Sequence, residues 1–163
     1  MTASNSTLLE ALRSTPIAAE LSPEQSAVLA GLMQLRACET RQVLGCEGEV
    51  DDRLVIVVDG ALAVVRHVDT PDETLLTALR PGDVAHELGF LDGTPRFASL
   101  LATEQTRVLE LKRDALESLI DTHPRILYAV MLAIARAVHR VQTRLSIQAS
   151  ELVNYVVKQH GRY

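Results

Sequence analysis

Short apolar runs rich in β-branched residues, each closed by a turn signal, fill the middle of this chain from about residue 35 to residue 112. Strand candidates lie at 54–58, 61–65, 74–79, 97–102 and 106–111. Most of them have no helix-length pattern between them. Many short strands at near-regular spacing are typical of antiparallel barrels and jelly rolls. We therefore expect a mainly β protein, an antiparallel β jelly-roll barrel with flanking helices.

The runs at 54–58 and 61–65 are separated by Asp59-Gly60. A two-residue turn between twisted strands requires positive φ angles, which Asp-Gly adopts readily. This pair of runs therefore predicts a β-hairpin.

Helical patterns flank the β region on both sides. Ser22 followed by Pro23 is a helix start signal, and the apolar face that follows is formed by Val28, Leu29, Leu32 and Leu35. A short helix is expected at about 113–122 and a longer one from His123-Pro124 onward. We expect residues 1–14 to be flexible and residues 15–163 to form one domain.

The longest helix should run from about 125 to 157, because no Gly or Pro occurs between Pro124 and Gly161. Its residues at spacings of three and four are apolar in all but one position, which favours a coiled-coil seam between two copies of the chain. The seam residues are Ile134, Val138, Val141, Leu145, Gln148 and Leu152. The alternative, a helix packed on its own barrel, applies to the first half. We expect a homodimer through the second half.

Composition excludes several classes of protein. The net charge of −5 and the scarcity of aromatic residues argue against a general nucleic-acid binder. The longest stretch without Asp, Glu, Lys or Arg is 25–35, too short for a membrane span, and the first residues lack a signal-peptide pattern. Two cysteines are too few for a disulfide scaffold. These features predict a cytoplasmic protein with reduced thiols.

The densest group of chemically useful residues lies at 82–99, GDVAHELGFLDGTPRFAS. A short helix starting near Glu87 would attract an anion to its first turn, and Arg96 would offer a bidentate fork to a phosphate. A carboxylate nearby can accept hydrogen bonds from sugar hydroxyls. Together these groups suit a ribose phosphate. The alternative is that Glu87 and Arg96 simply pair with each other.

This segment resembles the phosphate-binding cassette of the cyclic-nucleotide-binding domain family, to which the catabolite activator protein belongs. The family pattern runs Gly-Glu-Leu, a few residues, then Pro-Arg-x-Ala-Ser/Thr. The matching residues here are Gly82-Asp83, Glu87-Leu88, Gly93-Thr94-Pro95-Arg96 and Ala98-Ser99. Similarity extends over about residues 15–150, including the helix start at Ser22-Pro23 and the segment Glu47-Gly48-Glu49 to Gly60.

The resemblance implies a ligand site and a function. Glu87 would bind the ribose 2′-hydroxyl and Arg96 the cyclic phosphate. Backbone N–H groups of Leu88 and of Phe97 or Ala98 would complete the phosphate cradle, and Gln142 with Thr143 would meet the base. The resemblance therefore implies a regulatory domain that binds a cyclic nucleotide, cyclic AMP first among them, and signals through its long helix.

Two residues depart from the family pattern. His86 replaces the glycine that precedes the glutamate, and Phe97 replaces a small or hydroxyl residue after the arginine. Either change would reshape the pocket or abolish binding. The alternative function is a barrel without ligand that acts as a dimerisation or scaffold module.

Other functions have weaker support. Pro81-Gly82-Asp83 followed by His86 resembles half of a cupin metal motif, but the partner histidines are missing from the sequence. No nucleophile triad, P-loop or paired catalytic carboxylate stands out, so we expect no enzyme activity, metal or cofactor. Only a few residues follow Val157. We therefore expect no specific DNA binding and an output through a partner protein in trans.

Overall fold

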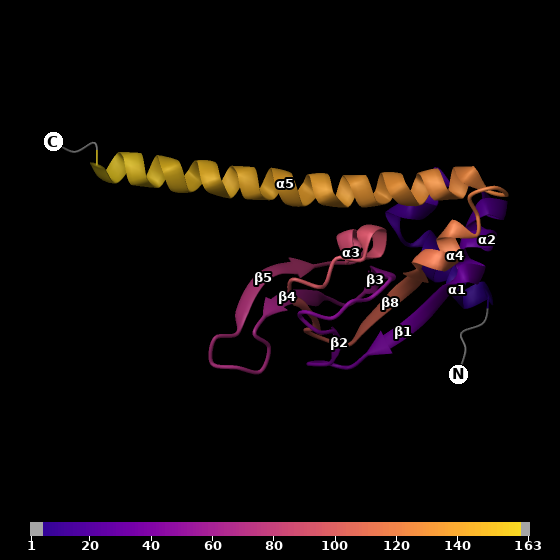
Figure 1. Ribbon diagram of the computed structural model, residues 1–163, viewed down its shortest axis with the longest axis horizontal. Helices are drawn as coiled ribbons and strands as arrows, with labels where there is room; N and C mark the ends of the chain where they lie inside the picture. Colours follow the sequence, from indigo (N-terminus) through magenta and orange to yellow (C-terminus); the bar gives the residue numbers. More distant parts are fainter. Residues whose placement is uncertain (1–4, 161–163) are drawn as a thin grey trace.

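Two four-stranded antiparallel sheets lie at the centre of the protein, as the computed structural model of residues 5–160 shows (Figure 1). The side chains of residues 141, 144, 145, 152 and 156–160 are not described. The first sheet has the order β1-β8-β3-β6 and the second β2-β7-β4-β5. Among the described strands no pairing joins the two sheets, so the predicted jelly roll is confirmed as two open sheets rather than a closed barrel.

The strands are β1 (Met33–Cys38), β2 (Val43–Gly45), β3 (Arg53–Asp59), β4 (Leu62–Arg66), β5 (Thr74–Leu79), β6 (Val84–Ala85), β7 (Ser99–Ala102) and β8 (Thr106–Lys112). The helices are α1 (Asn5–Arg13), α2 (Pro23–Leu32), α3 (Glu87–Asp92), α4 (Arg113–Glu117) and α5 (Pro124–His160), with a 3₁₀ turn η1 (Pro16–Glu20). The helix expected over 113–122 is therefore shorter and ends at Glu117.

Strand β3 is buried on both faces. Leu54 and Ile56 pack against the helices, whereas Val55 and Val57 pack between the two sheets. A strand covered on both sides needs a continuous apolar run rather than an alternating one. This explains why the sequence 54–58 is apolar at every position.

The hairpin predicted at Asp59-Gly60 is wrong. A turn is present, and Gly60 has φ +77°, but β3 and β4 belong to different sheets. β3 pairs with β6 and β8, whereas β4 pairs with β5 and β7. A Cβ at Gly60 would lie 2.4 Å from the Gln105 carbonyl oxygen, so glycine is needed where the chain crosses between sheets.

The amino-terminal helices pack on the first sheet. Ser22 and Gln25 form a capping box at the start of α2, as the sequence predicts. The prediction of a flexible segment at 1–14 is wrong for residues 5–13, which form α1 and bury Leu12 completely. Leu35, expected on the helix face, lies instead in β1.

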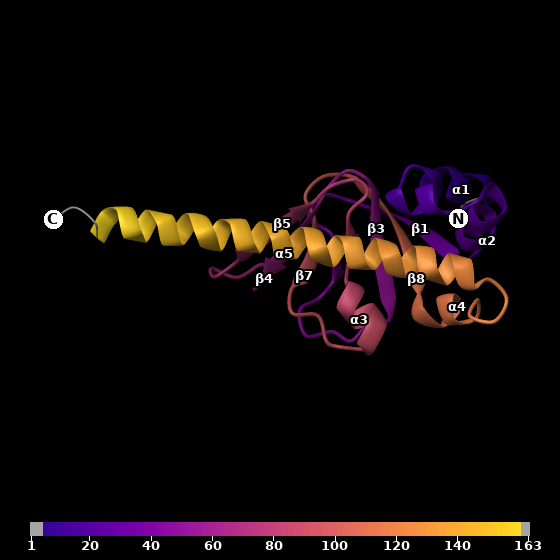
Figure 2. The ribbon, with the colours of Figure 1, turned by 90° about the horizontal axis from the view of Figure 1, so that it is seen from above.

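Helix α5 runs along the whole molecule, above the sheets in the view of Figure 1, and its C-terminal part extends beyond the strands (Figures 1 and 2). Its first half contributes Ile126, Val130, Ile134 and Ala137 to the core shared with α1 and α2. No helix in the described part of the chain is long and apolar enough to cross a membrane.

Candidate ligand-binding site

The cassette at 82–99 folds as a strand end, a short helix and an extended return. β6 ends at Ala85, His86 adopts a left-handed conformation with φ 64°, and α3 begins at Glu87, as the sequence predicts. Gly93, with φ 76°, ends the helix. Helix α3 lies between α5 and the sheets in the view of Figure 1, and Figure 2 shows it to one side of α5. The fold therefore places the cassette beside the first half of the long helix.

The His86 side chain occupies the space that a side chain at position 89 would need. The imidazole lies against Gly89, where a Cβ would be 2.1 Å from the His86 Cε1 atom. Its Nε2 atom lies 2.8 Å from the Asp51 carbonyl oxygen. Burial lowers the pKa of His86, and the hydrogen bond to the Asp51 carbonyl opposes this effect; the Arg96 charge lowers the pKa further, against the charges of Asp51 and Glu87. The residue that replaces the family glycine is thus packed and linked to the loop before β3.

Arg96 is the central residue of the site. Its side chain is only 3% exposed, and its Nη2 donates to the Asp51 carboxylate at 2.8 Å. Its Nε is buried with no hydrogen-bond partner among the described residues. Backbone hydrogen bonds of Arg96 to Gly48 and Glu49 fix its position beside the 45–53 loop. The alternative that Arg96 pairs with Glu87 is wrong, because its partner is Asp51.

The other predicted cassette residues differ in their burial. Glu87 is half-buried in the first turn of α3, and no hydrogen bond or ion pair engages its carboxylate within the described part of the chain. Leu88 is exposed and Ala98 is buried. Phe97 is 70% exposed, so its ring does not fill the interior of the site. The cassette therefore leaves the Glu87 carboxylate unpaired, whereas Asp51 already takes one of the two donors on the Arg96 fork.

Asp51 is a site residue that the sequence interpretation missed. Its Oδ1 accepts from the Arg53 backbone N–H at 3.1 Å and lies 3.8 Å from the Arg53 Nε. Burial raises the pKa of the Asp51 carboxyl, but the hydrogen bond and charge of Arg96, with help from Arg53, hold it below its usual range. The only sequence signal was an acidic pair directly before a buried strand.

Arg113 was also missed. This first residue of α4 donates from Nε to the Phe90 carbonyl at 2.5 Å and from Nη2 to the Gly89 carbonyl at 2.9 Å. These two carbonyls belong to α3. Arg113 therefore ties the cassette helix to the segment that leads into α5.

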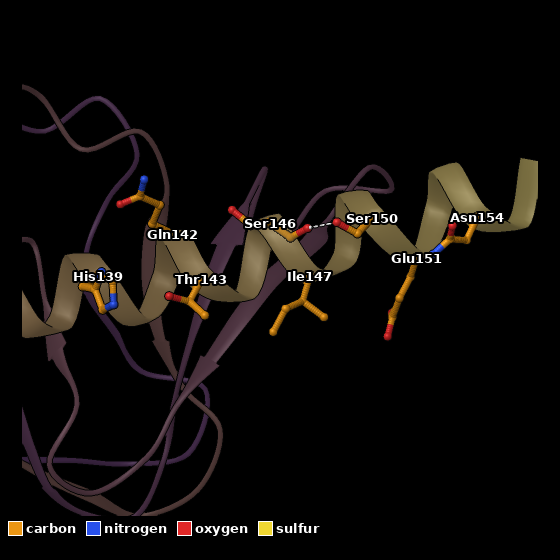
Figure 3. A pocket seen from close by; sticks show the side chains of 8 residues that line it. All are labelled: His139, Gln142, Thr143, Ser146, Ile147, Ser150, Glu151 and Asn154. Atoms are coloured by element: carbon orange, nitrogen blue, oxygen red, sulfur yellow. Dashed lines mark hydrogen bonds between the residues drawn. The ribbon is translucent and has the colours of Figure 1, made fainter.

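The residues expected to meet the base lie elsewhere. Gln142 and Thr143 are exposed and line a hollow of about 440 Å³ along α5. Figure 3 shows that its eight lining side chains all come from this one helix. Neither Glu87 nor Arg96 lines this hollow. The structure does not bring Gln142 together with the cassette in one pocket.

The predicted seam residues divide into three groups. Ile134 is buried in the core of its own chain, so it already has intramolecular partners. Val138 is 38% exposed, and Gln148 is exposed. Val141, Leu145 and Leu152 lie outside the described side chains. An exposed seam would therefore begin at Val138.

In the part of the chain that the structure describes, no group of three or more His, Cys, Asp or Glu side chains is arranged so that it could hold a metal ion. Both cysteines are free, Cys38 buried and Cys46 exposed.

Comparison with known proteins identifies the family. A family model described as "Cyclic nucleotide-binding domain" matches residues 35–123, more than half of the chain. The chain is 32% identical over 125 residues to the CRP-like cAMP-activated global transcriptional regulator of Mycobacterium tuberculosis, covering 76% of this chain and 56% of the relative. The chain belongs to the cyclic nucleotide-binding domain family. It spans little more than half the length of this relative.

Solved structures show the same fold. A cyclic nucleotide-binding domain from Methylobacillus flagellatus has a TM-score of 0.75 at 22% identity, covering 95% of this chain and 87% of that one. The catabolite activator protein of Thermus thermophilus has a TM-score of 0.67 at 25% identity, covering 83% of this chain and 63% of that one. The resemblance noted in the sequence is thereby confirmed.

Proposed function

We propose that this chain is a ligand-sensing regulatory module whose cassette binds cyclic AMP. The observation that carries the proposal is the buried Arg96 guanidinium, whose Nε has no partner among the described residues. A buried donor without an acceptor is costly, and a phosphate oxygen would satisfy it. Two relatives, from Mycobacterium tuberculosis and Thermus thermophilus, are named for cyclic AMP. These names favour cyclic AMP over other cyclic nucleotides.

Glu87 would recognise the ribose. Its carboxylate has no hydrogen-bond partner in the described part of the chain and sits nine residues before Arg96, across the cassette. It can accept from the 2′-hydroxyl, while the backbone N–H groups of Leu88 and Phe97 or Ala98 add to the phosphate cradle. The ligand would then be held by its sugar and phosphate, which all cyclic nucleotides share.

Helix α5 would carry the signal as a dimer. Its C-terminal part extends beyond the strands (Figure 1), and Val138 and Tyr155, which share the predicted spacing of three and four, are 38% and 62% exposed. Apolar side chains repeated at this spacing along an exposed helix favour contact with a second copy of the same helix. Movement of α3 would reach α5 through Arg113 and α4.

Thermal unfolding with ligand tests the proposal. A ligand at a hundredfold its Kd stabilises a native protein by about 2.7 kcal/mol. Cyclic AMP should therefore raise the Tm, and 5′-AMP, which lacks the cyclic phosphate, should raise it less. Arg96→Ala should abolish the shift and Arg96→Lys should restore part of it, because an ammonium lacks the planar fork. Arg107→Ala, which removes an exposed arginine paired with Asp59, is the matched control and should keep the shift.

Glu87→Gln separates ribose recognition from phosphate recognition. The amide oxygen can still accept from the 2′-hydroxyl, so this variant should lose less affinity than Arg96→Ala. Calorimetry with cyclic AMP and cyclic GMP measures both losses. Equal binding by the parent and by Arg96→Ala would place the ligand elsewhere.

A scaffold module without ligand is the second candidate. The observation that favours it is the Asp51 carboxylate, which already holds Arg96, together with the His86 imidazole in the place of the family glycine. This candidate predicts that no cyclic nucleotide changes the Tm. It also predicts that Arg96→Ala lowers the Tm without altering any ligand response.

A further inference from the structure

Asp51 lies between two arginines that are each incompletely paired. Its Oδ2 accepts from Arg96 Nη2 at 2.8 Å, and its Oδ1 lies 3.8 Å from Arg53 Nε. The two buried side-chain atoms that lack a hydrogen-bond partner in the described residues are Arg96 Nε and Arg53 Nε. Each of these two unpaired donors thus belongs to an arginine that lies next to the Asp51 carboxylate.

The Arg96 fork cannot serve Asp51 and a phosphate equally well. Nε and Nη2 lie on one edge of the guanidinium, and an anion that binds this edge bidentately needs both. Asp51 takes Nη2 and leaves Nε unpaired. A phosphate on that edge would also place a second negative charge beside the half-buried Asp51 carboxylate. The ligand must therefore compete with Asp51.

Arg53 offers Asp51 an alternative partner. Its Nε is already near Oδ1 and has no other hydrogen bond, although its Nη1 lies 3.8 Å from the Glu110 carboxylate. Asp51 and Arg53 both line a hollow of about 450 Å³, so the carboxylate has room to rotate. The Asp51 backbone is held meanwhile, because its carbonyl contacts His86 Nε2.

We propose that Asp51 is an internal competitor for the ligand phosphate, which leaves Arg96 and pairs with Arg53 when the ligand binds. This inference rests on the proposed function of the cassette. It makes Asp51 and Arg53 affinity-setting residues, although Arg53 does not touch the ligand. Asp51 should weaken ligand binding, and Arg53 should strengthen it.

Two substitutions test this prediction. Asp51→Asn keeps the shape and the acceptor for the Arg53 N–H but removes the charge, so cyclic AMP should bind about fivefold more tightly, the scale of one side-chain hydrogen bond. Arg53→Met removes the alternative partner, so binding should weaken by a similar factor. In the double variant the Arg53→Met effect should vanish, because no charge remains to move. Calorimetry at one ionic strength measures all four affinities.

Two matched control variants show whether the loss of any nearby charge changes the affinity for cyclic AMP. Asp52→Asn deletes a neighbouring carboxylate that lines the same hollow and has no side-chain hydrogen bond among the described residues. Arg36→Met deletes the other arginine that pairs with Glu110. Both controls should bind cyclic AMP like the parent. Without ligand, Asp51→Asn should melt at a lower temperature than Asp52→Asn, because only the first loses an ion pair.

The outcomes distinguish this inference from the proposed function. If the parent binds and Asp51→Asn binds equally or more weakly, Asp51 only positions Arg96 and the inference fails while the function stands. If the parent does not bind but Asp51→Asn does, Asp51 closes the site and the inference is supported. If no variant binds cyclic AMP or cyclic GMP, the proposed function fails and the inference fails with it.

Discussion

The Arg96 guanidinium lies directly over Gly45, the last residue of β2. A Cβ on Gly45 would be 2.5 Å from Arg96 Nε and 2.6 Å from Cζ. Real side chains do not approach this closely, so the buried arginine occupies the space that any other residue at position 45 would need. Glycine at position 45 therefore makes room for Arg96, although it has no functional group of its own.

We expect Gly45→Ala to displace Arg96. The added methyl group has no free space, and overpacking at a buried site costs about 1–3 kcal/mol. The Tm of this variant should be lower than that of the parent, and its affinity for cyclic AMP should be weaker. Gly31→Ala is the control, because a Cβ at Gly31 in α2 meets nothing within 4 Å. That substitution should raise stability by up to about 1 kcal/mol through helix propensity and leave binding unchanged. If Gly45→Ala kept the parent's affinity for cyclic AMP, binding would not depend on the position of Arg96 over Gly45.

His86 should make stability depend on pH. Its pKa in the folded protein is below the ordinary 6.5, because burial disfavours the charged imidazole and Arg96 repels it, whereas Asp51 and Glu87 act in the opposite direction. The unfolded chain then binds more protons than the folded one below pH 6.5. The stabilising contribution is therefore complete above that pH and is lost as the pH falls towards the lowered value.

Urea unfolding at several pH values between about 5 and 7.5 measures this dependence. The parent should lose free energy of unfolding as the pH falls, and His86→Gln should lose less of it over the same range. His139→Gln removes an exposed histidine and should retain the parent slope. Parallel curves for the parent and His86→Gln would contradict the prediction.

Arg113 should hold the cassette helix in place. It donates to two carbonyls of α3, and hydrogen bonds from a charged donor contribute about 1.5–3 kcal/mol. Arg113→Met should therefore unfold more easily and exchange the amides of 87–93 faster, as hydrogen-exchange mass spectrometry would show. Arg125→Met, which removes an exposed arginine from the first turn of α5, should change neither. Unchanged exchange in α3 would mean that the sheets alone hold the cassette.

Local patterns in the sequence predicted the local structure well. The Ser22-Pro23 helix start, the strands 74–79 and 106–111 and the short helix at Glu87 depend on neighbouring residues, and each is present. The pairing of the strands was not predicted correctly. Asp59-Gly60 has the turn chemistry of a hairpin, yet the chain passes from one sheet to the other there, because that choice depends on strands far away in the sequence.

The same limit applies to the site. Glu87 and Arg96 belong to one continuous motif and were found from it. Asp51 and Arg113 reach the cassette from 45 and 24 residues away, through contacts that no spacing in the sequence reveals. The helix α1 was missed because its residues before Leu8 carry no apolar pattern. Its stability comes from the burial of Leu12 and from its packing against α2.

The final prediction concerns dimerisation through α5. Ile134 belongs to the core of its own chain, so a seam between two copies has to lie at Val138 and beyond. Val141 and Leu145 continue the spacing of three and four from Val138. Val141→Glu should weaken the dimer by a few kcal/mol, about a hundredfold in the dissociation constant, because two unpaired carboxylates would meet at a two-fold axis.

Sedimentation velocity over a range of concentrations measures the change. Ser150→Glu is the matched control, since it adds the same charge to an exposed position of α5 outside the predicted seam. The control should remain dimeric at concentrations where Val141→Glu is a monomer. A parent chain that sediments as a monomer at high micromolar concentration would exclude the seam.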